Sequence, residues 1–353
     1  MELPASQQCW RMTVSRKVLF LENHMKVHCQ RAGRQLSNLS SFGKHPIVSR
    51  SGIHRLTPAL VGLVCLSATV ISGCGGGSGG SGNGLGNARI IVFQSDRDGD
   101  NEILSMDVGG GNVKRITDNA VEDLEPAISP DGSSIAFVSN RTGNSEIFLV
   151  NSSGTRQLTS NTESDRKPSF SPDGRTLVFV GTRNRITDLY LLDIATGRQT
   201  RLTNTAAAED DPTYAPDGNI IYTSNEQNPR FQILEIDPSD QSVKSLTQEP
   251  SNHFRPSVSA DGRKVVYAND ASGNQDLYWI DRSTSGKNEV PIPVRVSSGA
   301  FSDSDPSFSP DGRKIVFSSN RSGNFDIYSM NTDGSNVERL TNDPGSDRIP
   351  SIR

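Results

Sequence analysis

One histidine and a recurring acidic residue are the side chains of this sequence whose types and spacing could support chemistry. They stand three residues before the proline of each repeated segment, at Asp123, Asp165, Glu209, His253, Asp303 and Asp347. Such residues can cap a turn by accepting backbone N–H bonds. They can also form an acidic rim at one mouth of a channel, which would attract a basic partner loop or a cation. Both alternatives stay open, and these six residues are the candidate partner-binding site, in which His253 would make one sector pH-sensitive.

Catalytic sets are scarce in the part of the sequence after Cys74. This part has one histidine, His253, and no cysteine. A Ser-His-Asp triad in this part could use only His253 as its base, and a metal site with several histidines or with cysteines is excluded there. The Gly-x-Ser-x-Gly match at residues 76–80 lies in a glycine tract, whereas a nucleophile elbow needs a strand before it and a helix after it. We predict no catalytic residues and no cofactor.

Three aspartates resemble a calcium loop at first sight. Asp96, Asp98 and Asp100 alternate along the chain, but the glycine of this segment is in the wrong place for such a loop. The aligned segments "SNRTGNSEI" and "SNRSGNFDI" indicate a hairpin turn instead, so we predict no metal site. An enzyme that uses a pair of carboxylates stays open as an alternative, because acidic residues are plentiful.

Charge is distributed unevenly along the chain. Residues 1–73 hold nine of the 36 Lys and Arg residues and two of the 40 Asp and Glu residues, so the remainder carries a net charge of about −11. A body this acidic is repelled by phosphate backbones. Nucleic acid is therefore not an expected partner.

The N-terminal part is typical of a secretory leader. Residues 56–73 form an uncharged apolar run after Arg50 and Arg55, and the run ends in Ile71-Ser72-Gly73-Cys74. This end resembles a bacterial lipobox, in which the cysteine becomes the lipidated first residue. We expect a leader over 1–73, a lipidated Cys74 followed by a glycine-rich tether over 74–87, and a single folded domain over 88–353.

Two features of this leader leave alternatives open. About 55 residues precede the apolar run, which is long for a basic leader, so we hypothesise that translation starts downstream of Met1. An uncleaved transmembrane helix is the alternative to lipidation, although the run is short for a span of about 20 residues. Gly75 is not the aspartate that holds many bacterial lipoproteins at the inner membrane, so the outer membrane is favoured.

The folded domain is built from a repeat. Asp-Gly pairs at 131, 173, 217, 261 and 311 recur with spacings of 42 to 50 residues. In the last copy, Pro310-Asp311-Gly312 has the residues of a β-turn, and Ile315 and Phe317, two residues apart, are expected on one face of a strand. Further turns at "SGN" and "TDG" complete four short antiparallel strands. Four strands in about 45 residues are the signature of a propeller blade.

Six blades are predicted. The aromatic residue that ends the second strand recurs six times, at Phe93, Phe137, Phe179, Tyr222, Tyr267 and Phe317. The first unit lacks its opening strand, and "DRIPSIR" at 347–353 matches that strand in "DRKPSFS". The fold class is therefore all-β: a six-bladed propeller with four antiparallel strands per blade, closed by the C-terminal strand so that no edge stays open.

Arginines recur at the second turn of four blades. Arg97, Arg141, Arg183 and Arg321 are each followed by an acidic residue. Those acidic residues are Glu102, Glu146, Asp188 and Asp326. The spacing predicts inter-hairpin ion pairs between these arginines and acidic residues, worth about 0 to 1 kcal/mol apiece. The fourth and fifth blades depart from the pattern, with Glu226 and Ala271 at the arginine position.

These motifs together resemble the propeller repeat of the TolB family. They are Asp-x-x-Pro before Ser-Pro-Asp-Gly, then Ser-Asn-Arg, Ile-Tyr and Arg-Leu-Thr, over roughly residues 88–353. TolB is the periplasmic component of the Tol-Pal envelope system, and it carries an α/β domain where this sequence has a glycine tract. The resemblance implies a non-enzymatic, monomeric module that binds an envelope protein. The protein would be exported and lipid-anchored at the periplasmic side of the outer membrane or at the cell surface.

Two other functions remain as alternatives to protein docking. One is binding of a ligand or glycan in the central channel. The other is an enzyme that acts on a polysaccharide. Fold alone does not decide among them.

Overall fold

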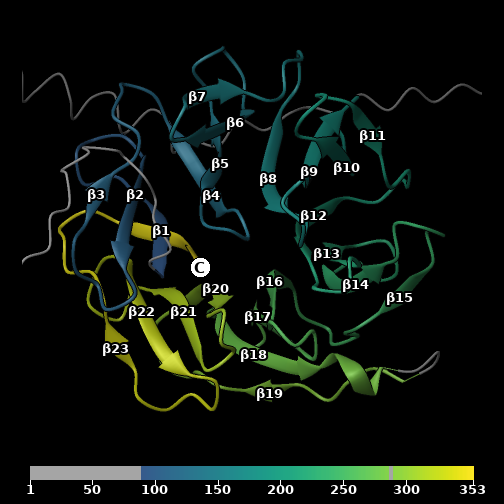
Figure 1. Ribbon diagram of the computed structural model, residues 1–353. Helices are drawn as coiled ribbons and strands as arrows, with labels where there is room; N and C mark the ends of the chain where they lie inside the picture. The colour runs from purple at the N-terminus through teal and green to yellow at the C-terminus, as the bar shows by residue number, and fades with distance from the viewer. Residues whose placement is uncertain (1–88, 286–288) are drawn as a thin grey trace, which may run out of the picture. The chain divides into compact units, whose positions relative to one another are not determined.

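Six four-stranded antiparallel sheets surround a central axis in the computed structural model, which describes residues 89–285 and 289–353 (Figure 1). We number the sheets as blades in chain order. Blade 1 has the strand order β24-β1-β2-β3, and blades 2 to 6 contain β4–β7, β8–β11, β12–β15, β16–β19 and β20–β23. The predicted all-β, six-bladed propeller is confirmed.

Each blade runs from an inner strand at the channel to an outer strand at the periphery (Figure 1). The inner strands are β4 (Asp123–Ile128), β8 (Asp165–Phe170), β12 (Glu209–Tyr214), β16 (His253–Val258), β20 (Asp303–Phe308) and β24 (Asp347–Ile352). The second strands are β1 (Ile90–Ser95), β5 (Ser134–Ser139), β9 (Thr176–Arg183), β13 (Ile220–Ser224), β17 (Lys264–Asn269) and β21 (Lys314–Ser319).

The third strands are β2 (Glu102–Asp107), β6 (Glu146–Asn151), β10 (Ile186–Asp193), β14 (Gln232–Ile236), β18 (Asp276–Asp281) and β22 (Asp326–Asn331). The outer strands are β3 (Lys114–Arg115), β7 (Gly154–Gln157), β11 (Gln199–Arg201), β15 (Val243–Ser245), β19 (Val294–Arg295) and β23 (Glu338–Arg339). One short 3-10 helix, η1 (Arg282–Thr284), follows β18. No helix in the described ranges is long and apolar enough to cross a membrane.

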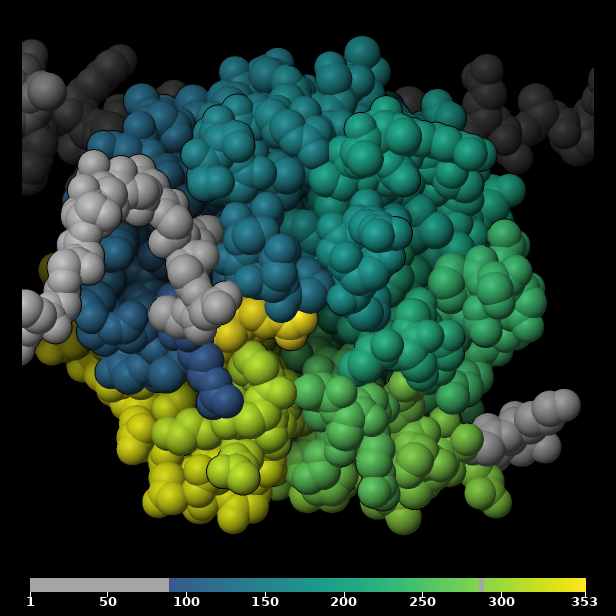
Figure 2. All heavy atoms as spheres, in the orientation of Figure 1, coloured from purple at the N-terminus to yellow at the C-terminus, as the bar shows by residue number. Residues whose placement is uncertain are grey.

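The C-terminal strand closes the ring, as predicted. β24 pairs antiparallel with β1, with Ile91 opposite Ile352 and Ser95 opposite Asp347. The yellow end of the chain therefore lies against the blue start of the propeller (Figure 2). Blade 1 thus obtains its inner strand from the far end of the sequence, and the ring has no unpaired inner edge.

The core lies between neighbouring blades, where the second and third strands of one blade pack against the next. Phe179 and Tyr190, for example, pack with Ala136 and Ile147 of the preceding blade. The six recurring aromatic residues lie inside the second strands and do not end them as predicted, and they are among the largest fully buried side chains. The recurring threonine of Arg-Leu-Thr accepts a hydrogen bond from the third strand, as Thr341 Oγ1 does from Ile327 N at 2.9 Å. The repeated residues therefore form contacts that every blade needs.

The Ser-Pro-Asp-Gly turn that joins inner and second strands is held by its aspartate. In blade 6, Ser309 Oγ donates to Asp311 Oδ1 at 2.7 Å, and Lys314 N donates to Ser309 Oγ at 2.9 Å. Gly312 adopts a positive φ of 65°, which a residue with a side chain rarely does. The turn is therefore specified by local hydrogen bonds and by one glycine.

The pKa of Asp311 is expected at about 2, chiefly because Ser309 and the N–H of Arg313 donate to its carboxylate. An aspartate in the unfolded chain has a pKa of about 3.9. Because the folded value is the lower one, this carboxylate stabilises the fold above about pH 4, and the contribution is lost as the pH falls toward 2. A carboxyl-carbon NMR titration measures the value, and Ser309→Ala should raise it. An Asp311 pKa near 4 in the unsubstituted chain would contradict the described turn.

Candidate functional site

The six candidate partner-binding residues do not form an exposed acidic rim. Each begins an inner strand, but all six side chains are fully buried in the blades. They are Asp123, Asp165, Glu209, His253, Asp303 and Asp347. The expectation of an exposed rim is therefore wrong, because a hydrogen bond or ion pair satisfies each of these groups inside the protein. Their direct contact with a partner has no support in this geometry.

Four of the aspartates hold the recurring arginines, and we call these pairs the blade latches: Asp123–Arg141, Asp165–Arg183, Asp303–Arg321 and Asp347–Arg97. In blade 6, Arg321 Nη2 donates to both oxygens of Asp303 at 2.8 and 2.9 Å. Its guanidinium also lies over the Phe317 and Tyr328 rings, 5.4 and 4.9 Å from their centroids. Each latch thus joins the inner strand to the second turn of the same blade.

The predicted inter-hairpin pairing of the arginines with the acidic residues that follow them is therefore wrong, because the arginines bind the inner-strand aspartates instead. The acidic residues after the arginines have other partners: Asp326 binds Arg339 at 2.7 Å and Asp188 binds Arg201 at 2.5 Å. Glu146 accepts from Thr159 at 2.6 Å. Each arginine binds the inner-strand aspartate and not the acidic residue that follows it in sequence. The aspartate offers two oxygens in a buried site, where a charged hydrogen bond is stronger.

Blades 4 and 5 lack a latch. In blade 4, Glu209 accepts from the hydroxyls of Thr203 and Thr205, and burial raises the pKa of its carboxyl. In blade 5, His253 Nδ1 donates to the Phe231 carbonyl at 3.0 Å, and its Nε2 lies 3.3 Å from a Glu249 oxygen. Burial acts to raise the pKa of Glu249, but the interaction with His253 outweighs it and the pKa lies below its usual value.

Replacement of His253 by aspartate is expected to destabilise the protein by about 2 kcal/mol, because a buried carboxylate would have no cation. Ala271 occupies the position of the latch arginine in this blade. The double variant His253→Asp/Ala271→Arg should therefore recover most of the lost stability by creating a fifth latch. Urea unfolding of both variants at pH 7 measures the effect. Equal stability of the single and double variants would show that the latch geometry does not transfer to blade 5.

The residue before each inner-strand proline lines the channel. We call these six residues the channel belt: Glu125, Lys167, Asp211, Arg255, Asp305 and Ile349. All six adopt positive φ angles between 49° and 54°. The ladder between inner and second strand shifts register at the belt in every blade, as between Leu124 and Ala127. Proline cannot donate to the ladder, so a bulge forms there.

Five of the six belt residues alternate in charge around the ring, and Ile349 occupies the sixth position. Lys167 Nζ lies 2.6 Å from Asp211 Oδ1, and its backbone N–H donates to Glu125 at 2.8 Å. Burial acts to raise the pKa of Asp211, but Lys167 and Arg255 outweigh it and hold the pKa below its usual range. The belt therefore contains a network of ion pairs centred on Lys167 and Arg255.

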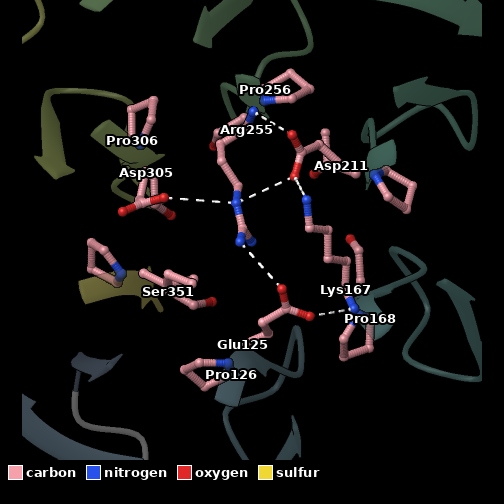
Figure 3. A pocket seen from close by; sticks show the side chains of 17 residues that line it. Glu125, Pro126, Lys167, Pro168, Asp211, Arg255, Pro256, Asp305, Pro306 and Ser351 are labelled. Carbon is pink, nitrogen blue, oxygen red and sulfur yellow. Dashed lines mark hydrogen bonds and ion pairs between the residues drawn. The ribbon is translucent and has the colours of Figure 1, made fainter. Parts of the chain in front are cut away.

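Arg255 spans the channel (Figure 3). Its Nε lies 3.2 Å from Asp211 and 3.7 Å from Asp305 in the neighbouring blades, and its Nη2 reaches Glu125 at 3.3 Å. Arg255 belongs to blade 5 and Glu125 to blade 2, which lie opposite each other in a ring of six. A molecule that passed through the channel would have to break this pair.

The belt is poorly suited to proton transfer. A general acid at neutral pH needs a raised pKa, whereas the pKa of Asp211 is lowered and its oxygens face Lys167 and Arg255. The described ranges also contain no group of three His, Cys, Asp or Glu side chains that could hold a metal ion. The ion pairs of the belt join residues of different blades across and around the channel.

Sequence reasoning missed the belt. The one signal in the sequence is a charged residue directly before the proline of an inner strand. The sign of this charge alternates from blade to blade. A residue before proline is normally extended, so nothing in the pattern predicts a side chain turned into the channel. The lipidation residue Cys74 and the motif at 76–80 lie outside the described residues.

Comparison with known proteins connects this geometry to one family. A family model described as the TolB beta propeller domain matches residues 85–166 and 153–291. A protein TolB homolog from Chlorobaculum tepidum is 38% identical over 61 residues, 17% of this chain and 14% of that protein. The chain therefore covers only a small part of that relative's length.

Two solved structures extend the comparison. TolB from Acinetobacter baumannii is 29% identical over 77% of this chain and 67% of that chain, with a TM-score of 0.66. Hydrazine synthase from Kuenenia stuttgartiensis is 18% identical over 75% of this chain and 46% of that chain, with a TM-score of 0.62. The second likeness is one of fold alone.

Proposed function

The chain belongs to the TolB β-propeller domain family, and from this premise we propose that it is a non-enzymatic module that docks an envelope protein at one mouth of its channel. The observation that carries the proposal is the ion pair between Arg255 and Glu125 across the channel. Because this pair spans the channel, a partner that engaged one mouth would have to break it to pass through, and this supports docking at a mouth. The mouth in question is the one where the inner strands begin.

The second residue of each inner strand lies one residue nearer to that mouth than the belt. Three of these residues are the proposed contacts with the partner: Arg166, Phe254 and Arg348. All three are partly exposed. The guanidinium of Arg348 lies 4.0 Å from the centroid of the Phe325 ring. Arginine and aromatic side chains are the types that most often dominate binding energy at protein interfaces. Arg166 lies 3.4 Å from Asp210 and Arg348 lies 3.7 Å from Asp305, so a partner's carboxylates beside apolar groups would compete with these long ion pairs for the two guanidinium groups and would meet Phe254.

A pull-down with a matched control tests this docking. The full chain is immobilised and incubated with solubilised envelope, beside Arg166→Ser/Arg348→Ser and the control Arg198→Ser/Arg313→Ser. Arg198 and Arg313 are exposed, so the control removes the same charge away from the mouth. We expect the mouth variant to retain less than about a tenth of the partner and the control to retain it all. Equal capture by both variants would refute docking at this mouth.

The enzyme alternative is the weaker one. Acid–base chemistry needs a carboxylate free to exchange a proton, and the carboxylates at the channel centre are ion-paired. The fold is shared with an enzyme such as hydrazine synthase, but a shared fold does not carry an activity with it. The proposal therefore assigns binding, and no catalysis, to the propeller.

We extend the proposal to the anchor: Cys74 carries the lipid that holds the propeller at the outer membrane. The support is the apolar run that ends at Gly73 and the glycine-rich segment that follows. Cys74→Ser is expected to move most of the protein from the membrane fraction to the soluble fraction, since stable anchoring depends on the lipid chains. Fractionation followed by mass spectrometry of the N-terminal peptide measures this. An unchanged membrane fraction would favour the uncleaved helix instead.

A further inference from the structure

A second cavity lies at the opposite end of the channel, where the inner strands end. Its volume is about 300 Å³. It is lined by the last residues of the inner strands and by residues of the turns that follow them, among them Pro130, Phe170, Tyr214, Ala260, Phe308 and Arg353. One charged side chain, Arg353, faces this apolar and aromatic lining.

Ring closure places Arg353 there. Blades 2 to 6 each follow the inner strand with an Asp-Gly turn, whereas in blade 1 the inner strand β24 is followed directly by Arg353. Its backbone pairs with Ile90, with N···O distances of 2.9 and 2.7 Å, and its Nε donates to the Pro130 carbonyl at 2.8 Å. The end of the chain accordingly lies close to the centre of the ring (Figure 1). The guanidinium is thus held at the cavity wall by a fixed backbone.

The guanidinium of Arg353 has no ion-pair partner among residues 89–285 and 289–353. Its terminal nitrogens have no carboxylate within 4 Å, in contrast to the buried Arg282, which lies 2.6 Å from Glu235 and 2.7 Å from Asp217. Burial lowers the pKa of Arg353, while the more distant Asp131 acts in the opposite direction. A half-buried guanidinium of this kind still has two parallel N–H donors to offer to an anion.

The walls restrict what that anion can be. Phe170, Tyr214 and Phe308 provide aromatic surface, and the volume lies at the small end of the range for ligand sites. The aspartates of the five Asp-Gly turns follow the lining residues: Asp131, Asp173, Asp217, Asp261 and Asp311. This acidic surround disfavours phosphates and other multiply charged anions. One carboxylate on an aromatic or branched apolar body fits both the single cation and the lining.

Tyr214 carries a further polar group among the lining residues. Its hydroxyl makes no hydrogen bond to any residue in the described part of the chain, and Tyr214 lines the cavity. Burial raises the pKa of this phenol, with Asp173 adding to the effect, so the hydroxyl remains a donor at physiological pH. A carboxylate bound by Arg353 could accept from it without any change in protonation.

We propose that this cavity is a binding site for a small monocarboxylate with an apolar body, held by the paired N–H groups of Arg353 and by the aromatic wall. The site lies beyond the ion pair of Arg255 and Glu125 from the proposed docking mouth. It therefore does not depend on the proposed docking function, and either one can fail without the other.

The test titrates the full chain, in detergent, with the probe 3-phenylpropionate. Binding of the probe is measured by ligand-observed NMR. The uncharged 3-phenylpropanamide has the same shape and serves as the first control. We expect a Kd of about 1 mM for an unoptimised probe of this size and binding of the amide at least about tenfold weaker. Arg353→Gln should weaken the carboxylate about tenfold and leave the amide unchanged. Ala260→Leu should fill the cavity and abolish both.

Two controls separate the site from general charge and from misfolding. Arg313→Gln removes an exposed arginine from an Asp-Gly turn at the same end of the channel and should leave binding unchanged. Inorganic phosphate should not compete with the probe. The proposal is overturned if the probe shows no saturable binding up to about 20 mM, if the amide binds equally well, or if folded Arg353→Gln binds like the unsubstituted chain. Equal weakening by Arg313→Gln would also overturn it.

Discussion

Deletion of residues 347–353 is expected to unfold the propeller at 25 °C. These residues form β24, the inner strand of blade 1, and their removal leaves β1 with an unpaired edge at the channel. It also leaves Arg97 without Asp347, whose two oxygens it binds at 2.9 Å. The buried Ile352, which packs with Ile91 and Val316, is lost as well. The combined loss is comparable to the whole stability of a typical domain, about 5 to 15 kcal/mol.

Circular dichroism and urea unfolding of the truncated and complete chains measure this effect. Arg353→Gln is the matched control, because it retains the whole of β24 and the backbone pairing with Ile90. The control should unfold cooperatively near the midpoint of the unsubstituted chain. A truncated chain that unfolds cooperatively and within about 1 kcal/mol of the complete one would contradict ring closure as the basis of stability.

Arg255→Met is expected to cost about 3 kcal/mol at pH 7, the second-largest effect. The change leaves the carboxylates of Glu125, Asp211 and Asp305 at the channel centre with fewer cations, and an uncompensated buried charge is strongly destabilising. Methionine is of similar length, so the loss reports on charge more than on packing. Because the Arg255 side chain is partly exposed, we expect a destabilisation at the lower end of the range for broken buried ion pairs.

The pH dependence distinguishes charge from packing in the Arg255→Met variant. In the unsubstituted protein the pKa of Asp211 is lowered, so its contribution to stability is present above the unfolded pKa of about 3.9 and is lost as the pH falls through the folded value. In the variant the Asp211 carboxylate loses a cation and its pKa rises, so protonation relieves the repulsion. The stability deficit should therefore shrink between pH 7 and pH 4.5. A constant deficit would point to packing, and Arg313→Met provides the exposed control.

The architecture was predictable because each blade repeats local signals. Pro310, Asp311 and Gly312 specify a turn through their own backbone preferences and short hydrogen bonds. The recurring aromatic at Phe317 predicted a strand, which β21 confirms, although Phe317 lies inside that strand and not at its end. The match of "DRIPSIR" to an inner strand predicted closure of the ring, and β24 confirms it. These features depend on residues close together in the sequence.

The candidate site was less predictable because it depends on contacts between distant residues. The sequence position of Asp123 fits an exposed residue at the channel mouth as well as a buried one. Its burial follows from its ion pair with Arg141, which the sequence does not reveal. The ion pair of Arg255 with Glu125 joins residues 130 positions apart across the channel. The left-handed backbone before proline, as at Glu125 with φ of 53°, is an exception to the usual preference for extended backbone.

Site-specific photo-cross-linking in the intact envelope tests the central claim most directly. A benzoylphenylalanine at Phe254, beside the docking mouth, is compared with one at Val337, an exposed residue at the outer edge of blade 6 that is 42% accessible. The account predicts one discrete cross-linked protein from Phe254, its loss in the Arg166→Ser/Arg348→Ser background, and no such product from Val337. A product from Val337 alone, or one from Phe254 that survives loss of both arginines, would contradict docking at this mouth.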